Sequence, residues 1–167
     1  MTASLPVRIA SLGSGVHTLR LTPDAAALGL DPSEFRDLDV AVRLDMGVGQ
    51  IVATVDASAT ATLVCDRTAQ PFDQRVQGAY TVLFTQNAEM ADEGDEEVRL
   101  YGAYDASLDL GDVVHDTLLL ALPHRRLAPG AEALDVPLRF GNDASDDAPA
   151  DDRWEALRRL RDDGSLN

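Results

Sequence analysis

Lysine is absent from this chain of 167 residues, whose 14 basic side chains are all arginine and are outnumbered by 29 acidic ones. The formal net charge of -15 would normally argue against a partner such as nucleic acid, because phosphate binding depends on positive side chains. Acidic surfaces that exclude lysine, however, are typical of adaptation to high intracellular salt, where the screening length falls to about 3 Å near 1 M. We therefore interpret the charge as halophilic adaptation, which describes the host's cytoplasm more than the partner.

Cysteine and long apolar runs are also scarce. The single cysteine, Cys65, cannot form an intramolecular disulfide, which agrees with a reducing compartment. No apolar run approaches the roughly 18 residues that span a bilayer, and the first four residues lack the features of a signal peptide. We expect a cytoplasmic protein without a membrane segment.

The sequence further lacks the common signatures of catalytic sites. It has no phosphate-cradling glycine loop, no nucleophile elbow and no paired metal-ligand motif. Tetrahedral zinc needs about four Cys or His ligands, and the chain offers Cys65 with the scattered His17, His115 and His124. We predict no catalytic residue, no metal and no cofactor, and the alternative is a metal- or thiol-dependent small-molecule enzyme of unknown reaction.

What the chain does have is β-strand patterning in its first half. Apolar and polar residues alternate over 7–10 and 16–21, which predicts a hairpin around the turn at 13–15. Long antiparallel strands are predicted over 40–46, 51–64 and 72–86. The acidic run 88–97 is interpreted as a solvated hairpin loop, because it lacks the ligand spacing of a calcium loop.

Helix signals are fewer. Thr22, Pro23 and Gly29 bound a short helix over 25–28. A longer helix begins at the capping residue Asp109 and ends before Pro123, and we expect its leucines to be core. The fold class predicted is α+β: a mainly antiparallel sheet or partly open barrel with one packed helix and a C-terminal helix.

The tail differs in composition from the rest. We expect a single β-rich domain over 1–140, a flexible acidic linker over 141–150 and a C-terminal helix over 151–164. That helix carries the only tryptophan, Trp154, so it must dock on its own domain or in a partner's groove to be stable.

A series of short motifs follows along the chain: Cys65-x-Arg67 with Pro71-Phe72, Tyr80-x-x-x-Phe84, Leu108-Asp109-Leu110, Leu118 to Pro123, and Asp152-Arg153-Trp154-x-x-Leu157. Their succession resembles the YceD family, known as large ribosomal RNA subunit accumulation proteins. The resemblance covers about residues 55–160. It implies a non-enzymatic factor that supports accumulation or processing of large-subunit ribosomal RNA, with a large-subunit precursor or a ribosomal protein as partner and direct RNA contact as one option.

The chain departs from this family at its cysteines. Members often carry Cys-x-x-Cys, but Thr68 stands where the second cysteine would be, and no cysteine follows Pro123. We therefore interpret the segment around Cys65 as a structural turn between two strands, shaped by Arg67 and Phe72. Cys65 itself is expected to be a small buried residue rather than a reactive thiol.

The candidate contact residues for RNA or protein are Arg67, His124, Arg125, Arg126 and Trp154. Three adjacent potential cations at 124–126 could grip phosphate, for which the planar guanidinium suits bidentate contacts. They could equally complement the preceding helix dipole and neighbouring carboxylates. Arg67 is open to both interpretations, because it could instead bond backbone carbonyls at the Cys65 turn.

Overall fold

A computed structural model of the chain describes residues 3–91 and 97–134, which belong to one compact unit ending at Leu134. The predicted linker at 141–150 and the predicted helix at 151–164, with Trp154, lie outside the described residues. In the described part, no helix is long and apolar enough to cross a membrane.

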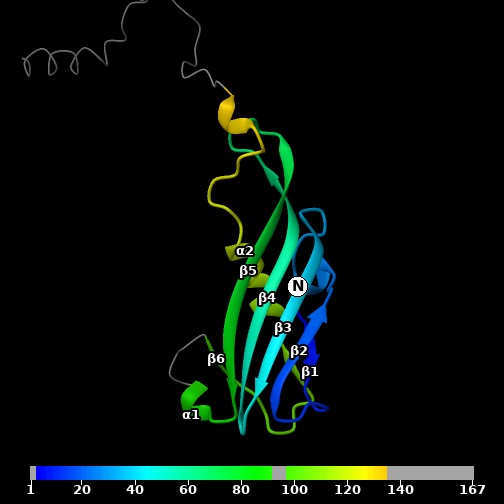
Figure 1. Cartoon of the computed structure of the whole chain (residues 1–167), viewed down its shortest axis with the longest axis vertical. Helices are drawn as coiled ribbons and strands as arrows, with labels where there is room; N and C mark the ends of the chain where they lie inside the picture. Colours follow the sequence, from blue (N-terminus) through cyan, green and yellow to red (C-terminus); the bar gives the residue numbers. More distant parts are fainter. Residues whose placement is uncertain (1–2, 92–96, 135–167) are drawn as a thin grey trace, which may run out of the picture. The chain divides into compact units, whose positions relative to one another are not determined.

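The unit is built on a five-stranded sheet in which the strands follow chain order (Figure 1). Its strands are β2 (Gly15–Leu21), β3 (Phe35–Met46), β4 (Gln50–Val64), β5 (Pro71–Thr85) and β6 (Val98–Leu100). The first four are antiparallel neighbours, whereas β6 runs parallel to β5. The sheet is open, so the prediction of an α+β fold with a mainly antiparallel sheet is confirmed.

Strand β4 shows why the sequence forms this sheet. Its residues are mostly small or β-branched, and every second one is buried, from Ile51 to Leu63. Its pairing with β5 runs without a break from Gln50 opposite Thr85 to Val64 opposite Pro71. The two long strands therefore form one regular hairpin with its turn at 65–70.

Helix α2 (Gly111–Leu120) covers the core face of the sheet, as predicted. Val114 and Leu118 are fully buried, and the helix comes close to β5 at Gly78. A Cβ on that glycine would lie 2.9 Å from both Cγ2 and the backbone oxygen of Thr117. Glycine at this position thus sets how closely the helix packs on the sheet.

The start of α2 differs from the predicted cap. The N-cap residue is Leu110, and Asp109 ends the short strand β7 (Ser107–Asp109). The Asp109 carboxylate still accepts the backbone N–H of Gly111 at 2.9 Å, and it also accepts that of Leu5 at 2.7 Å. The predicted cap therefore serves both the first turn of the helix and the N-terminal segment.

Two predicted hairpins are wrong. Strand β1 (Pro6–Arg8) pairs with β7, about a hundred residues away in sequence, and not with β2. Residues 88–97 do not close a hairpin either, because β6 returns parallel to β5 after the short helix α1 (Ala88–Ala91). Local alternation predicted these strands, but their partners depend on long-range hydrogen bonds that alternation does not encode.

The leucines of α2 are not all core. Leu118 is buried, but Leu119 is 40% exposed and Leu120 is 82% exposed. The apolar run 118–122 exceeds what one helix face can bury, so part of it reaches the surface. Two 3-10 helices complete the unit, η1 (Ala25–Leu28), which was predicted, and η2 (Ala131–Ala133).

Candidate functional site

The β4–β5 turn is a compact loop held by its own backbone. Cys65 N–H donates to the Gln70 carbonyl, and Ala69 N–H donates to the Cys65 carbonyl, each at 2.9 Å. Ala69 has a φ of 53°, in the left-handed region that non-glycine residues rarely adopt. Pro71, the first residue of β5, and half-buried Phe72 follow directly and pair with the end of β4.

The segment after α2 runs alongside the long hairpin to this turn, in yellow and orange in Figure 1. Asp66 N–H donates to the Arg126 carbonyl, and Arg126 N–H donates to Asp66 Oδ2, both at 2.7 Å. The Arg67 guanidinium donates to the Glu132 carbonyl at 3.0 Å. The turn therefore anchors residues 126–132, and Arg67 contacts a backbone carbonyl of that distant segment.

Cys65 takes part in the same anchorage. Its side chain is 1% exposed, and its Sγ accepts the backbone N–H of Ala128 at 3.3 Å. That hydrogen bond, with one from the Thr68 side chain, lowers the pKa of the Cys65 thiol from 9.0 to about 7. Cys65 is thus a buried residue, as expected, yet its thiol ionises more easily than an ordinary cysteine.

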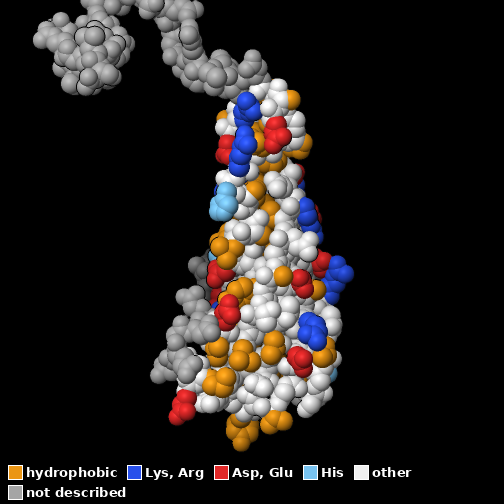
Figure 2. Space-filling model, turned by 60° about the vertical axis from the view of Figure 1, so that its left-hand side comes forward, with side chains coloured by type: hydrophobic (Ala, Val, Ile, Leu, Met, Phe, Trp, Pro, Cys, Tyr) orange, Lys and Arg blue, Asp and Glu red, His pale blue; other side chains and the backbone are white. Residues whose placement is uncertain are grey.

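The predicted basic residues His124, Arg125 and Arg126 lie on the surface at this end of the unit. On the face shown in Figure 2, basic side chains gather near the same end, with acidic side chains beside them. Within residues 3–91 and 97–134, the guanidinium groups of Arg125 and Arg126 have no hydrogen bond and no ion pair. The anchored backbone of Arg126 holds these cations in place while their side chains face solvent.

A hollow with both apolar and polar lining adjoins these cations. It is lined by Leu119, Leu120, Leu122 and Pro123, with Asp66, His124 and Arg126 at its polar side. The leucines of the predicted helix were expected to lie in the core, so this surface was not predicted. The sequence signal for this surface is the run of consecutive apolar residues at 118–122, which covers more of the helix circumference than one buried face.

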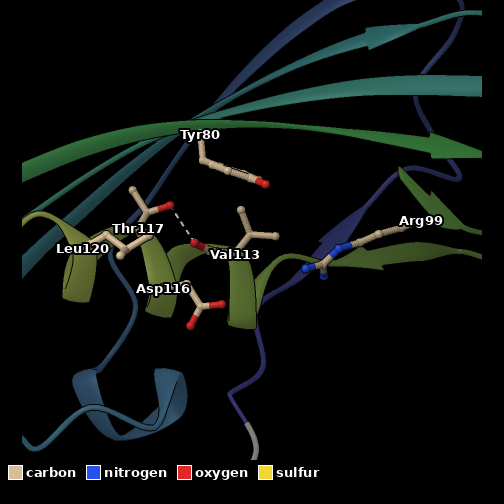
Figure 3. A pocket seen from close by; sticks show the side chains of 6 residues that line it. All are labelled: Tyr80, Arg99, Val113, Asp116, Thr117 and Leu120. Carbon is tan, nitrogen blue, oxygen red and sulfur yellow. Dashed lines mark hydrogen bonds between the residues drawn. The ribbon is translucent and has the colours of Figure 1, made fainter. Parts of the chain in front are cut away.

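A second hollow of about 130 Å³ lies between α2, β5 and β6 (Figure 3). Tyr80, Val113, Thr117 and Leu120 form its walls, with the polar Arg99 and Asp116 completing the lining. The Arg99 guanidinium is held by the Asp112 carboxylate at 2.6 and 2.8 Å. No sequence motif joined these residues, because they come from three separate elements.

Metal ligands do not cluster in the described part of the chain, where no three His, Cys, Asp or Glu side chains are arranged to hold an ion. The His115 ring bonds the Leu28 carbonyl, and the His17 ring bonds the Gly13 carbonyl, each at 2.8 Å. Cys65 and the three histidines are therefore not brought together.

Comparison with known families finds a match over most of the chain. The family model described as "Large ribosomal RNA subunit accumulation protein YceD" matches residues 53–161, a span that includes the β4–β5 turn, α2 and the basic segment after it. Searches of curated proteins and of solved structures give no significant match.

Proposed function

Because the chain belongs to the YceD family of large ribosomal RNA subunit accumulation proteins, we propose that it is a ribosome-biogenesis factor that acts through protein or RNA contacts. Membership assigns the chain to the accumulation of large-subunit ribosomal RNA. The proposal adds that it acts in the cytoplasm on a large-subunit precursor or a ribosomal protein. It also adds that residues 124–126 take part in the contact.

The observation that carries this proposal is the anchorage of a basic segment by the β4–β5 turn. Two hydrogen bonds between Asp66 and Arg126 fix the backbone, so the exposed guanidinium groups need little further ordering on binding. In an acidic chain, two arginines without a partner among the described residues suit a phosphate or a carboxylate of a partner.

We further propose that the chain acts without catalysis. Its only thiol is buried against the segment at 126–132, where a substrate would not reach it. The hollow beside Tyr80, the most enclosed of those described, has about 130 Å³ and is smaller than the roughly 300–1,000 Å³ of typical small-molecule sites. The larger hollows, such as the one of about 440 Å³ beside His124, are more open to solvent. Both observations favour a binding protein over an enzyme.

The test is cosedimentation with large-subunit precursors in sucrose gradients of cell extract, combined with complementation of a gene deletion. The double variant R125E/R126E should lower recovery in precursor fractions by about tenfold, as expected for losing two charged contacts. The matched control is R8E/R43E, which makes the same change in net charge on exposed arginines of β1 and β3.

The two parts of the proposal fail separately. Absence of the protein from every precursor fraction, together with normal large-subunit RNA after deletion, would overturn the ribosomal role. Equal recovery of R125E/R126E and wild type would reject the basic segment alone. A chain ending at residue 150 would then show whether the contact lies in the predicted helix with Trp154.

A further inference from the structure

Among the residues that the structure describes, strand β5 has an open edge along most of its length. It pairs with β4 over all its residues, but with β6 only from Leu83 to Thr85. The Leu83 N–H and the Thr85 carbonyl point away from β4, since they bond Glu97 and Tyr101. Successive residues of a strand point their backbone N–H and carbonyl groups to opposite sides. The odd-numbered residues from Asp73 to Thr81 therefore also present these groups away from β4.

These outward groups have no backbone hydrogen bond within residues 3–91 and 97–134. Soluble proteins usually protect an edge of this kind with a proline, a bulge or a covering segment. Here the β4–β5 register has no shift, and the only proline of β5 is Pro71 at its start. The segment after α2 runs alongside the hairpin (Figure 1), but no described backbone group of it bonds this edge. A regular edge whose backbone groups lack such bonds is a template for another extended strand.

The hollow of Figure 3 lies along this edge. Tyr80 reaches into it from β5, while Val113, Thr117 and Leu120 belong to the helix below. Leu120 is 82% exposed and therefore does not belong to the core. An added strand would direct alternate side chains toward α2, and the volume of about 130 Å³ suits one apolar side chain.

The charges around the hollow indicate the character of the added strand. Asp112 and Asp116 lie on the helix, and the only cation in the lining is Arg99, which is held by Asp112. Asp116 is exposed and has no ion pair among the described side chains. Asp116 would lie beside the face of the added strand that turns toward α2, whereas Arg75, on the opposite face, bonds only the Asp37 carbonyl and the Ser58 hydroxyl among the described groups. The net charge of -15 is therefore what favours a basic segment and disfavours a second copy of this acidic chain.

We propose that the β5 edge between Asp73 and Thr81 binds an extended, basic segment of a protein partner, with one apolar side chain seated against Tyr80 and Leu120. The segment lies in line with β6 and continues the sheet. Leu120 also borders the hollow beside His124 and Arg126, but the β5 edge itself does not include residues 124–126. The inference therefore goes beyond the proposed function and would hold for a protein partner in any pathway.

The probe is a fluorescent nine-residue peptide that alternates valine and lysine, titrated into the full-length chain and followed by anisotropy. Binding should protect the amides of Gln77, Ala79 and Thr81 from hydrogen exchange. The same peptide with N-methylated alternate amides should bind at least about tenfold more weakly, because main-chain hydrogen bonds supply the affinity. A valine–glutamate peptide should not bind.

Two variants of the chain complete the test. A79P removes an outward N–H while keeping the bonds to β4, and should weaken binding at least about tenfold, whereas its control A79S keeps the N–H and should bind normally. L120S removes a wall of the hollow on an exposed side chain and should weaken binding about fivefold. If A79P does not fold, L120S and the amide protection decide the question.

Three results would overturn the inference: no binding of the valine–lysine peptide, equal binding by folded A79P, or displacement of the peptide by single-stranded RNA. A dimer that dissociates on A79P substitution would show that a second copy occupies the edge, which also contradicts it. The R125E/R126E variant should bind the peptide normally, so this inference and the proposed function can fail independently.

Discussion

Asp66 and Arg126 are joined by two hydrogen bonds of 2.7 Å, one from each backbone N–H, although they are 60 residues apart. The first bond ends on the Arg126 carbonyl and the second on the Asp66 carboxylate. This pair fixes the basic segment to the β4–β5 turn. The segment's geometry therefore depends on a side chain outside it.

The first prediction concerns this pair. D66A should remove the bond to the Arg126 amide at a cost of about 1 kcal/mol in the free energy of local opening. Hydrogen exchange at that amide should then be about fivefold faster, while global stability changes little. D56A is the control, because Asp56 is also exposed and has no described hydrogen bond. Equal exchange rates in D66A and wild type would show that the bond contributes nothing.

The second prediction concerns the ionisation of Cys65. Hydrogen bonds from Ala128 N–H and the Thr68 hydroxyl lower its pKa to about 7, so the thiolate's ultraviolet absorbance should titrate near pH 7. Because the chain has one cysteine, the signal is unambiguous. T68V should raise the pKa by removing one donor. A wild-type midpoint near pH 9 would show that these hydrogen bonds do not stabilise the thiolate.

The same ionisation links stability to pH. A folded pKa below the unfolded one stabilises the native state above the unfolded pKa, and this contribution is lost as pH falls through the folded pKa. The wild-type free energy of unfolding should therefore rise, relative to that of C65S, between about pH 7 and pH 9. Urea unfolding at a series of pH values measures the difference, and a constant difference would contradict the linkage.

The sequence was sufficient for the elements whose signals are local. The alternation in β4 and the glycines after Met46 predicted the long strands, and Pro123 marked the end of α2. Pairing was less accessible, because the partner of β1 is chosen by hydrogen bonds such as that from Leu5 to Asp109. Residue propensities predict that a segment forms a strand, but they do not predict which other strand it pairs with.

The candidate site was predictable in part for the same reason. Arg125 and Arg126 follow His124 directly after the predicted helix, so the run of adjacent potential cations singled them out in an acidic chain. Their anchorage by Asp66 could not be predicted, since it joins a turn and a loop 60 residues apart. The exposure of Leu120 also depends on how α2 is rotated against the sheet, which an apolar run on several faces does not determine.

The third prediction tests the contact between α2 and β5. In G78A the new Cβ would lie 2.9 Å from the backbone oxygen of Thr117, so the helix must shift outward. We expect a loss of about 1–3 kcal/mol in the free energy of unfolding, measured in urea. G13A is the matched control, because a Cβ at Gly13 meets no atom within 4 Å. Equal stability of the two variants would show that the helix tolerates displacement.

The fourth prediction tests halophilic adaptation. With a net charge of -15, carboxylate repulsion opposes folding, and raising KCl shortens the screening length from about 10 Å at 0.1 M to about 3 Å at 1 M. The midpoint of thermal unfolding should therefore rise over this range. Near the sequence pI of about 4.3, the net charge is small and the salt effect should shrink. A midpoint at neutral pH that is independent of KCl would show that the acidic surface is not an adaptation to salt, and the absence of lysine would then need another explanation.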